Sequence, residues 1–119
     1  MSKGQQRKGA DGERELSAIL NACGYQTERG GSETFGTVPD IVGLPGIHIE
    51  CKRQEKLSIV DAMRQAVRDS EKFRDGMPTV FHRRNRQAWL VTMRLSDWLE
   101  LYRSSREPEN QRFPGTVLK

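Results

Sequence analysis

One segment in the first half of the chain combines strand-like apolar residues with two acids, and it reads Pro39-Asp40-Ile41-Val42-Gly43-Leu44-Pro45-Gly46-Ile47-His48-Ile49-Glu50-Cys51-Lys52. The connector Leu44-Pro45-Gly46 separates two apolar runs, Pro39–Gly43 and Ile47–Arg53. A short connector that contains Pro and Gly is typical of a tight turn between antiparallel strands. The segment therefore predicts a β-hairpin.

The predicted hairpin brings two carboxylates together. Side chains alternate between the two faces of a strand, so Glu50 and Lys52 share one face with His48. If the turn centres on Pro45, Asp40 lies opposite Glu50, with Cβ atoms about 4.5–5.5 Å apart. Carboxylates this close repel each other unless a proton or a cation lies between them, and Mg²⁺ prefers such oxygen ligands. Lys52 can then polarise a metal-bound water and stabilise charge on a phosphate.

A third acid is predicted on a helix that precedes the hairpin. The apolar residues Leu16, Ile19, Leu20 and Cys23 recur at helical spacing and predict a helix from about Ala10 to Cys23, with Asp11 as its N-cap. Glu13 lies on the same stripe, and a carboxylate on an apolar face must find a partner or a cation. Asp11 and Glu15 lie off the stripe, and we expect them to be solvated.

The remaining elements complete an α/β fold. We expect a short strand at Tyr25–Arg29, a Gly-rich loop over residues 30–37 and a helix that begins near Ser58. Two strands, Thr79–His82 and Ala88–Met93, and a helix, Asp97–Ser104, capped by Ser96, should follow. The order αβββαββα predicts a central mixed β-sheet flanked by helices. We expect the chain to form a single domain over residues 1–119, with a mobile basic N-terminal arm (1–9) and a loosely held tail (106–119).

Composition narrows the class of protein. The chain has 119 residues, and its 20 Lys and Arg exceed its 16 Asp and Glu, for a net charge of +4. This excess indicates either a polyanionic partner such as nucleic acid or an ordinary solvated surface. Cys23 and Cys51 form no CxxC pair, which argues against a thiolate metal cluster and a disulfide framework and favours buried free thiols. No apolar run has the length of a membrane span, and we expect a soluble cytoplasmic protein.

The residues alone leave several interpretations open. A Pro-Asp pair begins many turns, and Glu-x-Lys on an exposed strand is a common solvated pair, so catalysis at the hairpin competes with a structural role. The turn after His82 contains Arg83, Arg84 and Arg86, which either contact phosphate or are simply exposed. We expect His48 to be a partner of the polar face rather than a general base. Gln65 either reaches the acids or is solvated.

The hairpin also resembles a known pattern. Pro39-Asp40 followed by Glu50-Cys51-Lys52 resembles the motif of the PD-(D/E)xK nuclease superfamily. The preceding residues narrow the resemblance to archaeal-type Holliday junction resolvases and their phage-encoded relatives. They are Lys8-Gly9-Ala10-Asp11-Gly12-Glu13-Arg14-Glu15-Leu16, Gly24-Tyr25, Arg29 and Ser32. The similarity covers about residues 8–53, and the chain is short for an archaeal resolvase.

This resemblance implies a metal-dependent DNA endonuclease with a restriction-endonuclease-like core, active in DNA recombination and repair. Glu13, Asp40 and Glu50 would bind Mg²⁺, for which Mn²⁺ can substitute, and Lys52 would be the catalytic lysine. Metal-activated water would hydrolyse the phosphodiester and leave a 5′-phosphate and a 3′-hydroxyl. Ser32 would lie in a loop that touches the scissile region. The DNA contacts that we expect in total come from Lys8, Arg29, Ser32, Arg83, Arg84 and Arg86.

Other functions and assemblies remain as alternatives. A nicking or replication-repair endonuclease would share this core. A non-catalytic DNA-binding module should have lost an acid or the lysine, and none is lost; a protein-interaction domain with an incidental acidic hairpin is a further alternative. Branched DNA and two symmetric cuts favour a homodimer, which large apolar residues near the C-terminus also favour. These residues are Trp89, Trp98, Leu99, Leu101 and Tyr102, and the alternative is a monomer whose last helix covers the sheet.

Overall fold

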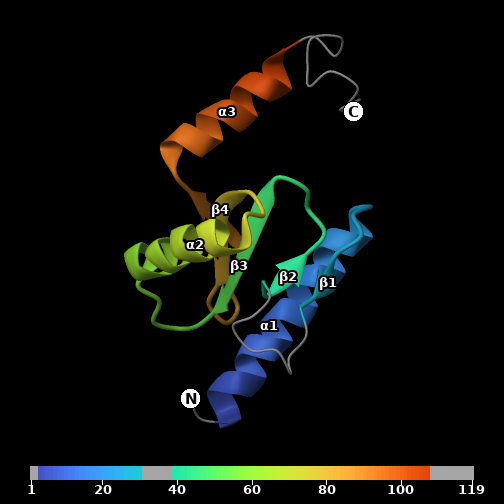
Figure 1. Ribbon diagram of the computed structural model, residues 1–119. Coiled ribbons are helices and arrows are strands. Elements are labelled where there is room, and N and C mark those ends of the chain that lie inside the picture. Colours follow the sequence, from blue (N-terminus) through green and yellow to red (C-terminus); the bar gives the residue numbers. More distant parts are fainter. Residues whose placement is uncertain (1–2, 31–38, 108–119) are drawn as a thin grey trace.

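The computed structural model describes residues 3–30 and 39–107. These residues form a five-stranded sheet and three helices (Figure 1). In chain order the elements are α1 (Lys3–Ala22), β1 (Glu28–Arg29), β2 (Ile41–Val42), β3 (Ile47–Arg53), α2 (Ile59–Phe73), β4 (Met77–Arg83), β5 (Leu90–Met93) and α3 (Leu95–Arg106). The predicted order αβββαββα is therefore confirmed.

The sheet has the spatial order β1-β2-β3-β4-β5. The β3–β4 pair is parallel, and the other three pairs are antiparallel. A parallel pair needs a crossover connection, which α2 supplies between β3 and β4. The predicted mixed sheet and the predicted antiparallel hairpin of β2 and β3 are both present.

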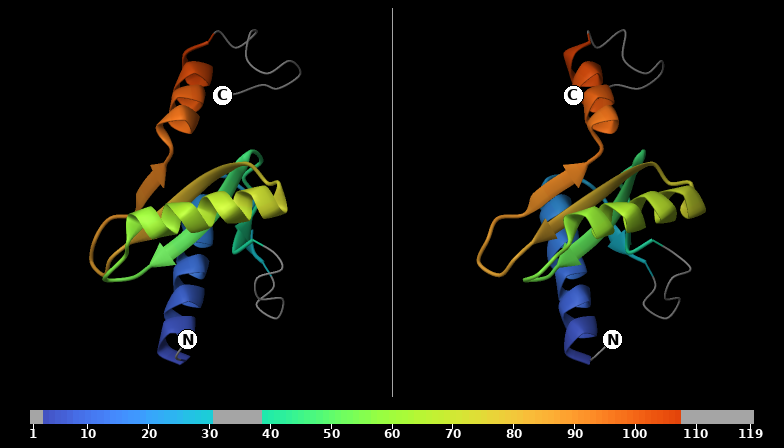
Figure 2. Two further views of the ribbon diagram at one scale, coloured as in Figure 1. Left: turned by 60° about the vertical axis from the view of Figure 1, so that its left-hand side comes forward. Right: turned by 90° about the vertical axis from the view of Figure 1, so that its left-hand side faces the viewer.

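The two longer helices cover opposite faces of the sheet (Figure 2). Leu16 of α1 packs with Ile49 and Cys51 of β3 in one apolar cluster. Ala62 and Ala66 of α2 pack with Val80 of β4 in a second cluster on the other face. Because side chains alternate along β3, His48 and Glu50 lie on the face that α2 covers. Each face of β3 thus contributes to a different layer of the protein.

Helix α1 begins earlier than predicted, at Lys3 rather than Ala10. Residues 3–9, which we expected to form a mobile arm, continue the helix. Once a helix is nucleated, each further residue adds a hydrogen bond, so glycines weaken it without stopping it. Asp11 consequently lies inside the helix and cannot be its N-cap; it accepts a hydrogen bond from Arg14 instead.

The predicted apolar stripe of α1 is buried only in part: Leu16 and Leu20 pack on the core, and polar contacts hold the end of the helix. Ile19 is 42% exposed, and Cys23, which we expected to be buried, is also exposed. The short strand β1 offers little apolar surface there. Instead, the hydroxyl groups of Ser17 and Thr27 lie 2.7 Å apart, and the Thr27 amide donates to the Asn21 side chain at 2.7 Å. These bonds attach the chain before β1 to α1.

The other boundaries agree with the sequence in part. Strand β3 has the predicted range, and Ser58 caps α2 by accepting a hydrogen bond from the Asp61 amide. Strands β1 and β2 are each shorter than expected, at two residues. Arg94, not Ser96, is the N-cap of α3, because that helix begins one residue before the serine. Helix α3 contains no buried residue and projects away from the sheet (Figures 1 and 2).

Gly76 is required where the chain passes from α2 to β4. Its φ is +128°, and a Cβ atom there would lie 2.2 Å from the carbonyl carbon of Gly46, in the β2–β3 turn. The next residue, Met77, donates its amide hydrogen to the Gly46 carbonyl oxygen at 2.8 Å. The two turns are therefore packed backbone to backbone, which anchors the start of β4 beside the start of β3.

We expect Gly76→Ala to lower the free energy of unfolding by about 2–3 kcal/mol, because it adds a steric clash to an unfavourable φ. Gly24→Ala is the matched control: its φ is +101°, but nothing lies within 4 Å of its added Cβ. In the control, the free energy of unfolding should fall only by the cost of the unfavourable backbone φ, about 1–2 kcal/mol. Urea unfolding of both variants measures the difference. Equal losses would show that the contact with Gly46 is unimportant.

Candidate active site

The β2–β3 hairpin places Asp40 and Glu50 opposite each other. Ile41 pairs with Ile49, and the same register continued by one residue pairs Asp40 with Glu50. Glu50 is 3% exposed, Asp40 is half-buried, and their side chains are hydrogen-bonded. The register predicted from the position of Pro45 is therefore confirmed.

The environment of Asp40 favours its protonated form. Burial, followed by the negative charges of Glu50 and Glu13, raises the pKa of Asp40 to about 7, although Lys52 acts in the opposite direction. The Lys52 ammonium lies 3.9 Å from Glu50 Oε2 and is largely shielded from solvent. Without a cation, the carboxyl pair therefore holds a proton near neutral pH. A divalent cation can replace that proton.

Glu13 approaches these acids from α1. A Cβ atom on the preceding residue, Gly12, would lie 2.9 Å from the Arg53 Cβ, so α1 and β3 are in close contact there. The Glu13 carboxylate accepts a hydrogen bond from Arg29 Nε at 2.9 Å, and both side chains are mostly buried. Arg29, which we expected to contact DNA, is thus the ion-pair partner of an acid that lies near Asp40.

His48 connects Glu50 to Asp75, the first of two acids that were not predicted as site residues. Its Nδ1 lies 2.8 Å from Asp75 Oδ2, and its Nε2 lies 3.3 Å from Glu50 Oε1. Burial opposes the charged imidazole, but the contacts with Glu50 and Asp75 outweigh it and raise the pKa of His48. The expectation that His48 is a partner of the polar face is confirmed.

Asp69 of α2 is the second acid that was missed. Among the described residues, one group of three metal-ligating side chains has its ligand atoms within 4.8 Å of one another: His48, Glu50 and Asp69. Burial and the nearby Glu50 raise the pKa of Asp69, while His48 and a hydrogen bond from Gln65 lower it. Helical spacing could have indicated this residue, because it lies three positions after the buried Ala66.

Glu15 is central to a different network, contrary to the expectation that it would be solvated. It accepts hydrogen bonds from Arg83 Nε at 2.6 Å and from the indole N–H of Trp89 at 2.7 Å. The bond from Arg83 is the main cause that lowers the pKa of Glu15. Helical periodicity could not reveal these partners, because they lie on the β4–β5 hairpin, far away in the sequence. Arg83, a predicted DNA contact, is therefore engaged within the protein.

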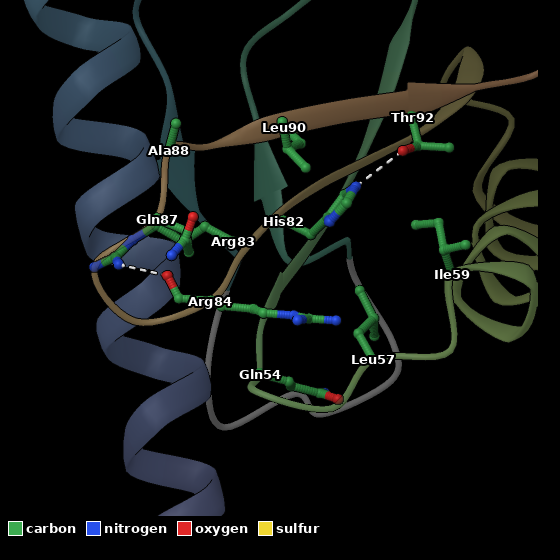
Figure 3. A pocket seen from close by; sticks show the side chains of 10 residues that line it. All are labelled: Gln54, Leu57, Ile59, His82, Arg83, Arg84, Gln87, Ala88, Leu90 and Thr92. Atoms are coloured by element: carbon green, nitrogen blue, oxygen red, sulfur yellow. Dashed lines mark hydrogen bonds between the residues drawn. The ribbon is translucent and has the colours of Figure 1, made fainter.

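The other predicted DNA contacts are less constrained or undescribed. Arg84 and Arg86 are exposed on the β4–β5 hairpin. Ser32 and the side chain of Lys8 lie outside the described residues. A cavity of about 650 Å³ adjoins this hairpin. Figure 3 shows the Arg84 side chain extending from the hairpin toward Leu57, which lines the opposite side of the cavity. The cavity is lined by Gln54, Leu57, Ile59, His82, Arg83, Arg84, Gln87, Ala88, Leu90 and Thr92, and it contains none of the acids.

The site has the composition of a hydrolytic metal centre for phosphodiesters. Two carboxylates share a mostly buried position, a third lies near them, and one lysine points to the same face. Oxygen ligands of this kind suit Mg²⁺ or Mn²⁺, and the lysine can stabilise negative charge on a phosphate.

Within the described residues, no helix is long and apolar enough to cross a bilayer.

A sequence model of the family described as archaeal Holliday junction resolvase (Hjc) matches residues 4–100. The chain belongs to this family. Among solved structures, this Hjc family member is similar to Archaeoglobus fulgidus Hjc, a Holliday junction resolvase from an archaeal hyperthermophile. The two are 28% identical, the match covers 72% of each chain, and the TM-score is 0.54. No curated protein matches the chain.

The family assignment confirms the resemblance drawn from residues 8–53 and extends it past the second helix. Hjc proteins are structure-selective nucleases that depend on a metal ion, so the expected class of function is confirmed. The mixed sheet with flanking helices agrees with the Hjc fold.

We expect Mg²⁺ binding to release a proton in a pH-dependent manner. With the pKa of Asp40 at about 7, the carboxyl is mostly protonated at pH 6, and binding should release close to one proton. At pH 9 the group is already ionised, so little release should occur, and affinity should rise with pH until it passes about 7. Calorimetric titration in buffers of different ionisation enthalpy measures the released protons. Equal release at both pH values would contradict the raised pKa.

Proposed function

We propose that this Hjc family member is a Mg²⁺-dependent endonuclease that cuts four-way and other branched DNA. Glu13, Asp40 and Glu50 bind the cation, and Lys52 is the catalytic lysine. The observation that carries this proposal is the Asp40–Glu50 pair, whose burial and mutual repulsion raise the pKa of Asp40 and favour a cation. Mn²⁺ has similar oxygen ligands and is expected to substitute.

Each residue has a separate task in the proposed hydrolysis. Glu13, Asp40 and Glu50 would hold the cation, which would supply an activated water when bound. Lys52, beside Glu50, stabilises negative charge on the attacked phosphate, and the products carry a 5′-phosphate and a 3′-hydroxyl. Arg29 holds the Glu13 carboxylate near Asp40 and limits its freedom to swing into solvent.

We propose that the DNA backbone extends from the acids toward the β4–β5 hairpin. The exposed Arg84 and Arg86 of that hairpin are suited to phosphate contacts, and Lys8 and Ser32 are further proposed contacts. Arg83 is less suited, because Glu15 already holds its guanidinium. A nicking or replication-repair endonuclease would use the same catalytic residues, and the preferred DNA structure distinguishes the two.

We also propose that the protein acts as a homodimer through α3. This helix exposes a row of large apolar side chains, and Trp98 stacks on Tyr102 with ring centroids 5.2 Å apart. An exposed group of large apolar side chains is typical of an interaction surface. Trp89, which we had grouped with these residues, instead packs on the core beside α1 and bonds to Glu15. The proposed interface is therefore restricted to the α3 helix.

We expect Asp40→Asn and Glu50→Gln to abolish cleavage of a labelled four-way junction while DNA binding persists, because each removes a metal ligand and a repulsive charge.

Lys52→Ala should lower kcat by about 10²–10³-fold and leave Mg²⁺ affinity nearly unchanged, since an ammonium is no ligand for Mg²⁺. Lys56→Ala, at an exposed position outside the site, is the control.

The assay includes flap, nicked, single-stranded and plain duplex DNA, each with Mg²⁺, Mn²⁺ or EDTA. Near-normal cleavage by both acid variants would refute the assignment of the site. Loss of Mg²⁺ binding in a folded Lys52→Ala variant would contradict the separate role of the lysine. Preference for nicked or plain duplex DNA over junctions would favour the alternative endonuclease.

We expect light scattering at micromolar concentration to give twice the 13.6 kDa mass of one chain. Leu99→Glu should produce a monomer, because it places a charge on the exposed apolar side of α3. Val60→Glu is the control, since Val60 is also exposed but lies on α2. A wild-type monomer, both free and on junction DNA, would rule out the dimer.

A further inference from the structure

The His48 ring is fixed in one orientation by its surroundings. The side chain is 1% exposed, and its ring stacks on Phe73 of α2 at a centroid distance of 6.4 Å. Both carboxylate oxygens of Asp75 lie within 2.9 Å of Nδ1. Asp75 therefore accepts the Nδ1 proton, and the other ring nitrogen, Nε2, points toward Glu50.

This orientation places two metal-ligating atoms side by side. Nε2 lies 3.3 Å from Glu50 Oε1, a separation at which an imidazole nitrogen and a carboxylate oxygen can bind one cation. Asp69 brings a third ligand atom within 4.8 Å of both.

We infer that His48, Glu50 and Asp69 form a cation position of their own, which takes Mn²⁺ or a similar transition metal. The inference rests on the proposed function in one respect, because Glu50 belongs to both positions. A metal-binding histidine typically donates its second ring N–H to a carboxylate, which is the role that Asp75 has here. An imidazole ligand favours transition metals over Mg²⁺, which prefers oxygen ligands.

The two oxygens of Glu50 separate this position from the one beside Asp40. Oε1 faces His48, whereas Oε2 lies on the side of Lys52, at 3.9 Å from its ammonium. The Asp40 side offers only oxygen ligands, and the His48 side offers one nitrogen with two carboxylates. Glu50 therefore bridges two positions of different metal preference.

A protonated imidazole that donates to both Asp75 and Glu50 is the competing arrangement, and a spectroscopic signature of nitrogen ligation distinguishes the two. The chain has only two histidines, His48 and His82. The ring of His82 lies on the cavity side of β4, where it is hydrogen-bonded to Thr92 at 2.9 Å. His82→Gln is therefore a matched control for His48→Gln.

The experiment is pulsed electron paramagnetic resonance of Mn²⁺ added to the tag-free protein. We expect ¹⁴N modulation from a directly bound imidazole in the wild type and in His82→Gln, and none in His48→Gln. Because His48 is buried and its variant can fail to fold, Asp75→Asn and Asp69→Asn give a second measurement by calorimetry. Each should weaken Mn²⁺ binding at this position by about 10–100-fold.

The possible failures are distinguishable. Mn²⁺ that binds and supports DNA cleavage without ¹⁴N modulation would overturn this inference, favour the protonated imidazole and leave the proposed function intact. Modulation that persists in His48→Gln, or unchanged affinity in both aspartate variants, would also overturn it. A wild-type protein that binds no Mn²⁺ and cuts no DNA would overturn both proposals.

Discussion

The register of the β2–β3 hairpin imposes the main physical constraint on this protein, because it sets Asp40 directly against Glu50 at the edge of a buried layer. Two desolvated carboxylates at this separation are unfavourable unless a proton or cation is present. The hairpin forms despite this unfavourable electrostatic energy because other interactions stabilise it. Ile41 and Ile49, which belong to the same pair of strands, are almost fully buried against α1.

The two helical layers divide the work of building the site. Helix α1 contributes Glu13 and stabilises the opposite face of β3, while the α2 crossover brings Asp69 and Phe73 over the face that carries His48 and Glu50. A parallel β3–β4 pair requires such a crossover, so the topology that completes the sheet also covers the acids. The proposed metal positions therefore depend on α2 as well as on the hairpin motif.

The contacts of the β4–β5 hairpin show how the same residue types serve different ends. Arg83 and Trp89 both bond to Glu15 and attach the hairpin to α1, whereas Arg84 and Arg86 remain exposed. An arginine cluster in a sequence is therefore not a single functional unit. Helix α3, which lies beyond this hairpin, contains no buried residue, so its apolar surface is not part of the core and is available for the proposed dimer.

The sequence by itself determined the elements whose cause is local. Strand alternation and the Pro45 turn predicted the β2–β3 hairpin and the opposition of Asp40 and Glu50, and the serine cap predicted the start of α2. The family could likewise be inferred from the resemblance of the Asp40 and Glu50-Cys51-Lys52 motif, together with the residues that precede it from Lys8 onward. These features depend on residues within a few positions of one another or on a periodic pattern.

Only the tertiary structure decided which distant side chains meet. Asp69 and Asp75 reach His48 because the α2 crossover brings them back to β3, and Glu15 finds Arg83 because α1 packs beside the β4–β5 hairpin. Helical spacing can place Asp69 on the buried face of α2, but it does not show which distant side chain Asp69 meets, since those energies arise from burial and electrostatics across elements far apart in the chain. The proposed ligands beside Asp40 could therefore be inferred from the motif, whereas the proposed ligands beside His48 became apparent only from the packing of α2 on β3.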